Sequence, residues 1–276
     1  MKINIPFLYQ FLLSLFLSFL CVLSTYAYES GAELAQAVYD RPDGDNVYSH
    51  GVMVLVEKGH KPRVRQMYSF REDRKNGDIV SMIRFEKPAE IKNTGLLTID
   101  YAIDKDTKQW INLPAIHKAR RISSSRKGGH FVGSDILYED LRDRKVSADH
   151  HKLLGEDKMN GIKVLKLESI PVKADNSVYS KKISWINPKS LVALRVDFYQ
   201  RGNKPVKRTL VKKLKKKQNF WTILDSVAID LKTQHKTYLK MDTVLYDKVI
   251  PTDLFSLRYL EDPQQEKNVI KVITGK

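Results

Sequence analysis

The sequence predicts a mainly β protein (α+β) in which about eleven antiparallel strands form one sheet that curls into an incomplete barrel enclosing, or capped by, short helices. Three observations support this fold. Segments rich in β-branched and aromatic residues recur along the chain, turn residues separate them, and no repeat or linker divides them. A flat sheet of this size would expose one whole face and two long edges, so we expect it to curl.

The N-terminus has the pattern of a secretory signal. Lys2 is the only charged residue before Glu29, residues 7–23 are almost wholly apolar, and small residues stand at Thr25 and Ala27. This pattern predicts a signal peptide at 1–27 with cleavage after Ala27. An uncleaved anchor helix is the alternative, because a bilayer span needs roughly 20 apolar residues.

Cleavage leaves one domain, residues 28–276, in the periplasm. The single cysteine, Cys21, belongs to the signal peptide, so the mature domain has neither a disulfide nor a thiol nucleophile. The chain holds 48 Lys and Arg against 32 Asp and Glu, a formal net charge of +16, which favours attraction to an anionic membrane surface. Nucleic acid, the other polyanion, is not an expected partner outside the cytoplasm.

One short helix is expected at the start of the domain. Ser30 and Glu33 have the spacing of a capping box, and apolar residues follow at helical spacing as far as Val38. Turn residues at 40–46 then end the helix.

Beyond this helix the apolar residues recur with a period of two or form short continuous runs. The expected strands are 52–56, 64–70, 79–85, 95–101, 109–113, 161–170, 180–186, 191–200, 208–215, 220–231 and 235–247. Several are apolar on both faces. Either side chains of the protein fill the inside of the curled sheet or a lipid-sized ligand does, and the pattern leaves both possibilities open.

The sequence lacks four common catalytic or nucleotide-binding motifs: G-x-S-x-G, H-E-x-x-H, the phosphate-binding glycine loop and G-x-G-x-x-G. His150 and His151 are adjacent and would point to opposite faces of a strand, which suits the surface better than a metal site. Ser134 and Asp135 resemble a turn and helix cap, with His130 as the one candidate base nearby. We therefore expect a protein that is not an enzyme and holds no cofactor or metal.

Residues 201–217 form a basic run of nine Lys or Arg without an acid. Such a run suits phosphate groups. Because apolar residues are interleaved, the preferred interpretation is a solvated strand whose lysines protect an edge, followed by a hairpin turn at Gln218 and Asn219.

The stretch 109–141 carries the most specific pattern: Trp-x-x-Leu-Pro-Ala, paired arginines, a serine run, Gly-Ser-Asp and Tyr-Glu-Asp. Its matching residues are Trp110, Leu113, Pro114, Arg120, Arg121, Ser123, Ser124, Gly133, Ser134, Asp135, Tyr138, Glu139 and Asp140. This set resembles the outer membrane lipoprotein-sorting family, LolA-like periplasmic proteins often encoded near exporters of the resistance-nodulation-division (RND) type. The similarity continues in 33–46, 83–101, 151–157, 183–199 and 250–261.

The resemblance implies a LolA/LolB-like half-barrel with an apolar concavity for acyl chains. It indicates a carrier or chaperone for a lipid or lipoprotein, working with an RND-type exporter in outer-membrane trafficking. The alternative is a non-catalytic adaptor of a transporter complex without cargo. A third possibility is an enzyme that acts on a ligand in the cavity, but the sequence shows no catalytic triad, metal-ligand set or cofactor motif to support it.

The residues expected to contact the acyl chain are Phe85, Leu97, Ile99, Trp110, Leu113, Tyr138 and Trp185. Arg120, Arg121 and Arg126 are expected at the rim, near a head group. Residues 114–141 would form a mobile rim whose part 134–141 is a lid helix. Alternatively, these arginines and Lys127 pair with Asp135, Glu139, Asp140 and Asp143.

Overall fold

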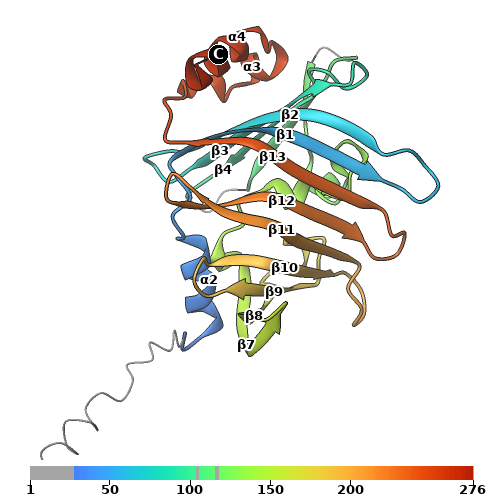
Figure 1. Ribbon diagram of the computed structural model, residues 1–276, viewed down its shortest axis with the longest axis vertical. Helices are drawn as coiled ribbons and strands as arrows, with labels where there is room; N and C mark the ends of the chain where they lie inside the picture. Colours follow the sequence, from blue (N-terminus) through green and yellow to red (C-terminus); the bar gives the residue numbers. More distant parts are fainter. Residues whose placement is uncertain (1–27, 104–105, 116–117, 276) are drawn as a thin grey trace, which may run out of the picture.

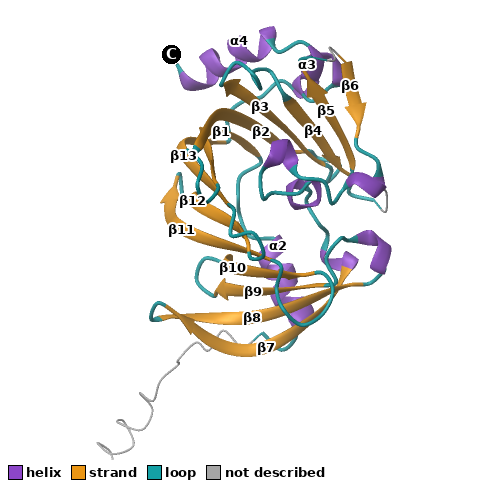
Figure 2. Cartoon of the chain, turned by 90° about the vertical axis from the view of Figure 1, so that its right-hand side faces the viewer, coloured by secondary structure: helices purple, strands orange, loops and turns teal. Residues whose placement is uncertain are grey.

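The computed structural model describes residues 28–103, 106–115 and 118–275, so the signal-peptide prediction for 1–27 lies outside the described residues. Within them, thirteen strands form a single antiparallel sheet in the order β6-β5-β4-β3-β2-β1-β13-β12-β11-β10-β9-β8-β7. The sheet curls until its two halves face each other and stays open between β6 and β7 (Figures 1 and 2). The expected incomplete barrel is confirmed.

The strands follow the alternating segments closely. They are β1 (Asn46–Val56), β2 (Arg63–Asp73), β3 (Ile79–Lys87), β4 (Gly95–Asp100), β5 (Lys108–Leu113), β6 (Lys118–Arg121), β7 (Asp149–Met159), β8 (Ile162–Pro171), β9 (Lys181–Asn187), β10 (Val192–Tyr199), β11 (Lys207–Lys217), β12 (Phe220–Asp230) and β13 (Lys236–Tyr246). The hairpin turn between β11 and β12 is at Gln218 and Asn219, as expected, and both have positive φ.

The sequence did not predict β6 and β7, the two edge strands. The strand β6 consists of Lys-Ala-Arg-Arg, and β7 contains the polar run Asp-His-His-Lys and later Glu-Asp-Lys. An edge strand pairs on one side, so its sequence needs less apolar patterning than that of a central strand.

The helix α2 (Gly31–Tyr39) begins as the capping box predicts. The Ser30 hydroxyl accepts a hydrogen bond from the Glu33 amide at 3.1 Å, while the Glu33 carboxylate accepts one from the Glu29 amide at 2.8 Å. Leu34 and Ala35 then pack against β8 and β9. Gly31 allows this approach, because a Cβ there would lie 2.6 Å from the backbone of His151.

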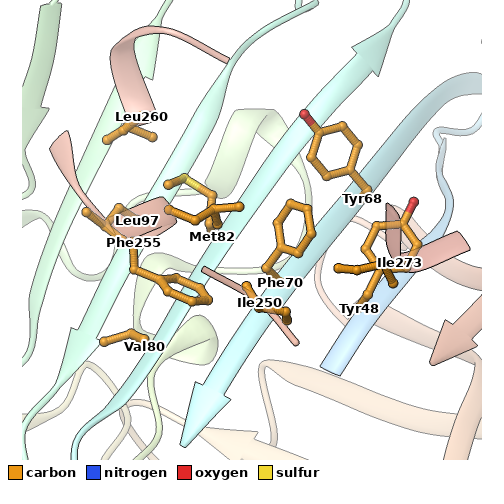
Figure 3. Packing of buried hydrophobic residues seen from close by; sticks show 11 residues of the cluster. Tyr48, Tyr68, Phe70, Val80, Met82, Leu97, Ile250, Phe255, Leu260 and Ile273 are labelled. Atoms are coloured by element: carbon orange, nitrogen blue, oxygen red, sulfur yellow. The ribbon is translucent and has the colours of Figure 1, made fainter. Parts of the chain in front are cut away.

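Two further helices, α3 (Leu257–Glu261) and α4 (Gln264–Thr274), follow the last strand and cover the convex face of β1–β4 (Figures 1 and 2). Leu260 of α3 and Ile273 of α4 belong, with Phe255 just before α3, to one apolar cluster with Tyr48, Phe70 and Met82 of the sheet (Figure 3). None of the helices described is long and apolar enough to cross a membrane.

A buried ion pair fixes these helices to the sheet. The Arg84 guanidinium donates to the Glu266 carboxylate at 2.5 Å and to the carbonyl oxygens of Tyr259 and Leu260. The side chains of Arg84 and Glu266 are 1% and 0% exposed. The phenol of Tyr68 donates to the same carboxylate at 2.5 Å, so the buried charge has several partners, as such a group requires.

Candidate functional site: the concave face and its inner segment

The concave face of the sheet is the candidate site, and a segment of the chain itself covers it. We call residues 128–141 the inner segment. It follows β6, contains single 3₁₀ turns at Phe131–Gly133 and Tyr138–Leu141, and contacts both halves of the curled sheet. It belongs to the green part of the chain, seen inside the curl in Figure 1.

The floor of the site is apolar. Neighbouring residues of a strand point to opposite faces, which explains why Leu96 faces the inner segment while Leu97 faces the C-terminal helices. The concave cluster includes Met53, Leu55, Met67, Phe85, Leu96 and Ile111 from β1–β5, together with Ala228 from β12.

Phe131 is the central apolar residue of the inner segment. It is 1% exposed, and its ring lies 5.6 Å from that of Phe85 and 6.0 Å from that of Tyr138, measured between centroids. Ile136 joins the same cluster, whereas Leu137 packs against Phe198 on the opposite half of the sheet. Side chains of the inner segment therefore fill this part of the concave face, which is the first of the two possibilities that the sequence pattern left open.

Polar contacts fix the inner segment in its middle, at Asp135, and near its C-terminal end, at Glu139. The Asp135 carboxylate accepts hydrogen bonds from Thr237 and His235 at 2.7 Å each, both contributed by the region of β13. The Glu139 carboxylate accepts from the Ser177 hydroxyl and, at 2.8 Å, from the Val178 amide. These acids are 4% and 7% exposed, so their charges depend on these donors.

Lys207 on β11 supplies a buried cation. Its ammonium group donates to the Asp140 carboxylate and to the phenol oxygen of Tyr179. Burial lowers the pKa of Lys207, while the Asp140 carboxylate acts in the opposite direction. Burial also raises the pKa of Tyr179, which keeps this phenol protonated.

A third connection joins the inner segment's continuation to β4. The Asp100 carboxylate accepts from the Asp143 amide at 2.9 Å and from the Thr107 hydroxyl at 2.5 Å. Burial raises the pKa of Asp100 to about 6, although both hydrogen bonds act to lower it. Tyr39 at the end of α2 donates to Asp143 at 2.8 Å, so the helix and the segment are tied together.

The structure separates the residues that we expected to contact an acyl chain. Phe85 and Tyr138 lie together in the concave cluster. Leu97, Ile99 and Trp110 pack in the convex cluster beneath the C-terminal helices. The binding role of these residues remains a prediction. Of the five, Phe85 and Tyr138 lie together on the concave face.

The remaining two lie elsewhere. Leu113 is 36% exposed at the end of β5. Trp185 on β9 donates from its indole nitrogen to Asp157 at 2.9 Å and lies beneath the Arg195 guanidinium, 4.1 Å from the ring centroid.

The expected rim arginines are accessible. Arg120, Arg121 and Arg126 are exposed, the first two on the edge strand β6. Within the described ranges, none of the three forms an ion pair with the acids proposed as alternatives, since Asp135 pairs with His235 and Asp140 with Lys207. Their role near a head group remains a prediction.

The structure corrects the expectation for 134–141. Only Tyr138–Leu141 is helical, as a single 3₁₀ turn, and Ile136 and Leu137 are buried against the sheet. Hydrogen bonds of Ser134 and His130 to neighbouring carbonyl oxygens favour a compact turn over a helix at this point. The segment therefore lies inside the curl and not on its rim.

Two cavities, of about 390 and 290 Å³, lie beside the C-terminal end of α2, where Tyr39 borders both. The larger one is lined mostly by polar groups, among them Asp43, Arg71, Asp73 and Asp143. Neither borders a residue of the expected acyl site. In the described residues no group of three or more His, Cys, Asp or Glu is arranged to hold a metal ion.

Residues that sequence reasoning missed complete the site. They are the polar partners of the inner segment, above all Lys207, Tyr179, His235 and Thr237. No acid lies near Lys207 in the sequence, so a solvated lysine was expected. Its partner in the structure, Asp140, comes from a distant segment. The positive φ of 50° at Val132, a β-branched residue, has no local sequence signal either.

Comparison with known proteins agrees with this architecture. A family model described as "-like: Uncharacterized protein" matches residues 77–262. A DUF1329 family protein from Desulfovibrio piger is 28% identical, with 83% of this chain and 97% of that chain covered and a TM-score of 0.79. An outer membrane lipoprotein-sorting protein domain from Vibrio parahaemolyticus is 26% identical, with 84% and 98% covered and a TM-score of 0.79.

A LolA superfamily protein from Nitrosomonas europaea shares the fold at 14% identity, with 83% of this chain and 99% of that chain covered and a TM-score of 0.66. No curated protein matches the chain. The half-barrel that the pattern in 109–141 implied is confirmed by these neighbours.

Proposed function

Because the chain belongs to the LolA-like family of outer membrane lipoprotein-sorting proteins, we propose that it is a periplasmic carrier or chaperone for acyl chains of a lipid or lipoprotein, and that it acts without catalysis. The observation that carries this proposal is the apolar floor of the concave face around Phe85, covered by a segment with little regular structure.

Physical need supports a carrier. Burial of an acyl chain contributes about 0.8 kcal/mol per methylene, so a 16-carbon chain that leaves a membrane loses on the order of 12 kcal/mol. In this proposal the acyl chain binds between the sheet and a displaced inner segment. It then takes over the apolar contacts of Phe131 and Ile136, so the floor of the site is not exposed to water during exchange.

The surroundings of the site suit this role. The exposed Arg120, Arg121 and Arg126 offer positive charge to an anionic head group, and the net charge of +16 attracts the protein to anionic membranes. Resemblance to proteins encoded near RND-type exporters supports such an exporter as the partner that loads or unloads the cargo.

The filled concave face favours a second candidate. In an adaptor without cargo, the inner segment would remain in place, and its contacts with Asp135, Glu139 and Lys207 would be purely structural. The two functions differ in one respect that can be measured: the carrier must displace the inner segment and the adaptor must not.

A reversible cross-link tests this difference. The Asp135 amide lies 2.9 Å from the Thr237 hydroxyl oxygen and the Asp135 carboxylate 2.7 Å from it, so the two residues are in direct contact and suit a pair of introduced cysteines. In Asp135→Cys/Thr237→Cys, we expect the oxidised protein to exclude a fluorescent fatty-acyl probe and the reduced protein to take it up. The single variant Asp135→Cys controls for oxidation.

Equal uptake by the oxidised and reduced forms, with the cross-link verified by mass, would place the probe outside the site proposed here. Absence of uptake in the reduced variant and in the unmodified protein would favour the adaptor.

A further inference from the structure

The strand β11 leaves its neighbour β10 partway along its length. Only the residues Lys207–Leu210 of β11 pair with β10, opposite Arg195–Phe198, whereas β12 accompanies β11 as far as Lys217. Register shifts occur at Val211–Lys213 and Lys213–Leu214. Such irregularities bend a strand and increase its twist, which explains why β11 and β10 separate there.

Residues 211–217 therefore form an edge inside the sheet, which we call the lysine edge. Within the described chain, β12 is the sole strand paired with this stretch. An edge of this kind presents backbone N–H and C=O groups that another extended chain can bind.

The side chains of the lysine edge are almost all cationic: Lys212, Lys213, Lys215, Lys216 and Lys217 are exposed. In the residues that the structure covers, none of them forms an ion pair with an acid; Asp225 is the acid opposite Lys213 in the β11–β12 register. Lys216 contacts the Trp221 ring, 5.5 Å from its centroid.

The lysines occupy both faces of the strand. Lys215 and Lys217 share one face and Lys216 points to the other, because side chains alternate along a strand. A flat membrane surface would meet one face only. An added strand also alternates its side chains, so its acids would meet lysines on both faces.

From this edge and these charges we infer that the lysine edge is a docking site for an acid-rich extended segment of a partner protein, which adds to β11 as a further strand in place of the missing β10 pairing. Lysines on an edge repel most other strands, including a second copy of this basic chain. The same charges select an acidic one, since opposite charges on neighbouring strands attract.

The test uses the mature chain and a labelled ten-residue peptide, Glu-Glu-Val-Val-Glu-Glu-Val-Val-Glu-Glu, whose acids lie on both faces of an extended strand. We expect saturable binding, read by fluorescence anisotropy, and slower hydrogen–deuterium exchange at residues 211–217. The variant Lys215→Glu/Lys216→Glu should bind roughly tenfold or more weakly. Lys58→Glu/Lys61→Glu, which makes the same charge change in the exposed β1–β2 loop, should bind nearly as well as the unmodified chain.

Backbone pairing is tested separately from charge. The same peptide with every backbone nitrogen N-methylated keeps its acids but has no amide donor on either edge, and we expect it not to bind. Equal binding of this peptide would overturn strand addition. Absence of peptide binding, together with binding to phosphatidylglycerol vesicles that the lysine-edge variant loses, would overturn the proposal in favour of a membrane contact.

Discussion

Phe131 and Phe85 provide a matched pair of substitutions, because their rings contact each other from the two sides of the proposed site. Phe131 belongs to the inner segment and Phe85 to the floor, and they are 1% and 0% exposed. Replacement of either by Ala removes a buried aromatic ring, which costs about 3–5 kcal/mol of unfolding free energy.

The two variants should differ in acyl binding. The Phe131→Ala substitution destabilises the closed state, in which the inner segment covers the floor of the site. A loss of about 3 kcal/mol there favours displacement of the segment and raises the apparent affinity for an acyl probe by up to roughly 100-fold. In Phe85→Ala the floor itself loses a contact surface, so affinity should fall.

Urea unfolding measures the stability of each variant, and titration with a fluorescent fatty-acyl probe measures its affinity. Opposite changes in affinity at similar loss of stability support displacement of the inner segment. A fall in affinity for Phe131→Ala as large as that for Phe85→Ala would refute it.

Three further predictions concern the buried polar groups. Glu266→Gln should lower the unfolding free energy by about 3–5 kcal/mol, because it leaves Arg84 buried without its counter-charge; chemical denaturation measures this, and a loss below 1 kcal/mol would contradict it. Lys207→Met should cost a similar amount by stranding Asp140, and addition of Asp140→Asn should recover part of the loss in a double-mutant cycle. Asp100 has a pKa of about 6 against a usual 3.8, so the folded state binds its proton more tightly. The protonated Asp100 therefore contributes up to about 3 kcal/mol to the unfolding free energy below pH 4, and this contribution is lost as the pH rises through 6. The difference in unfolding free energy between pH 5 and pH 8 should shrink in Asp100→Asn. An unchanged difference would exclude this carboxyl as its source.

The sequence was informative where local chemistry decides the structure. Alternation identified every central strand, because one or both faces of each pack on apolar neighbours. The Ser30 cap and the turn at Gln218 and Asn219 also follow from local rules. The edge strands β6 and β7 escaped because pairing on one side leaves their sequences polar.

The site was less predictable because its contacts join distant parts of the chain. Asp140 lies 67 residues from Lys207, and Asp135 lies 100 residues from His235. Both faces of β4 are covered, so the neighbouring Leu96 and Leu97 are both buried although they point to opposite faces. The sequence therefore identified apolar strands but did not indicate which face was the inner one.

The most direct test of the carrier is the lipid content of the protein itself. The mature chain, purified from periplasm without detergent, would be measured by native mass spectrometry and its lipid extracted and quantified. We predict close to one acyl lipid or lipopeptide per chain, displaced by excess fatty-acyl probe and absent from Phe85→Ala. A lipid-free protein that also fails to acquire lipid from phosphatidylglycerol vesicles would contradict the proposed carrier.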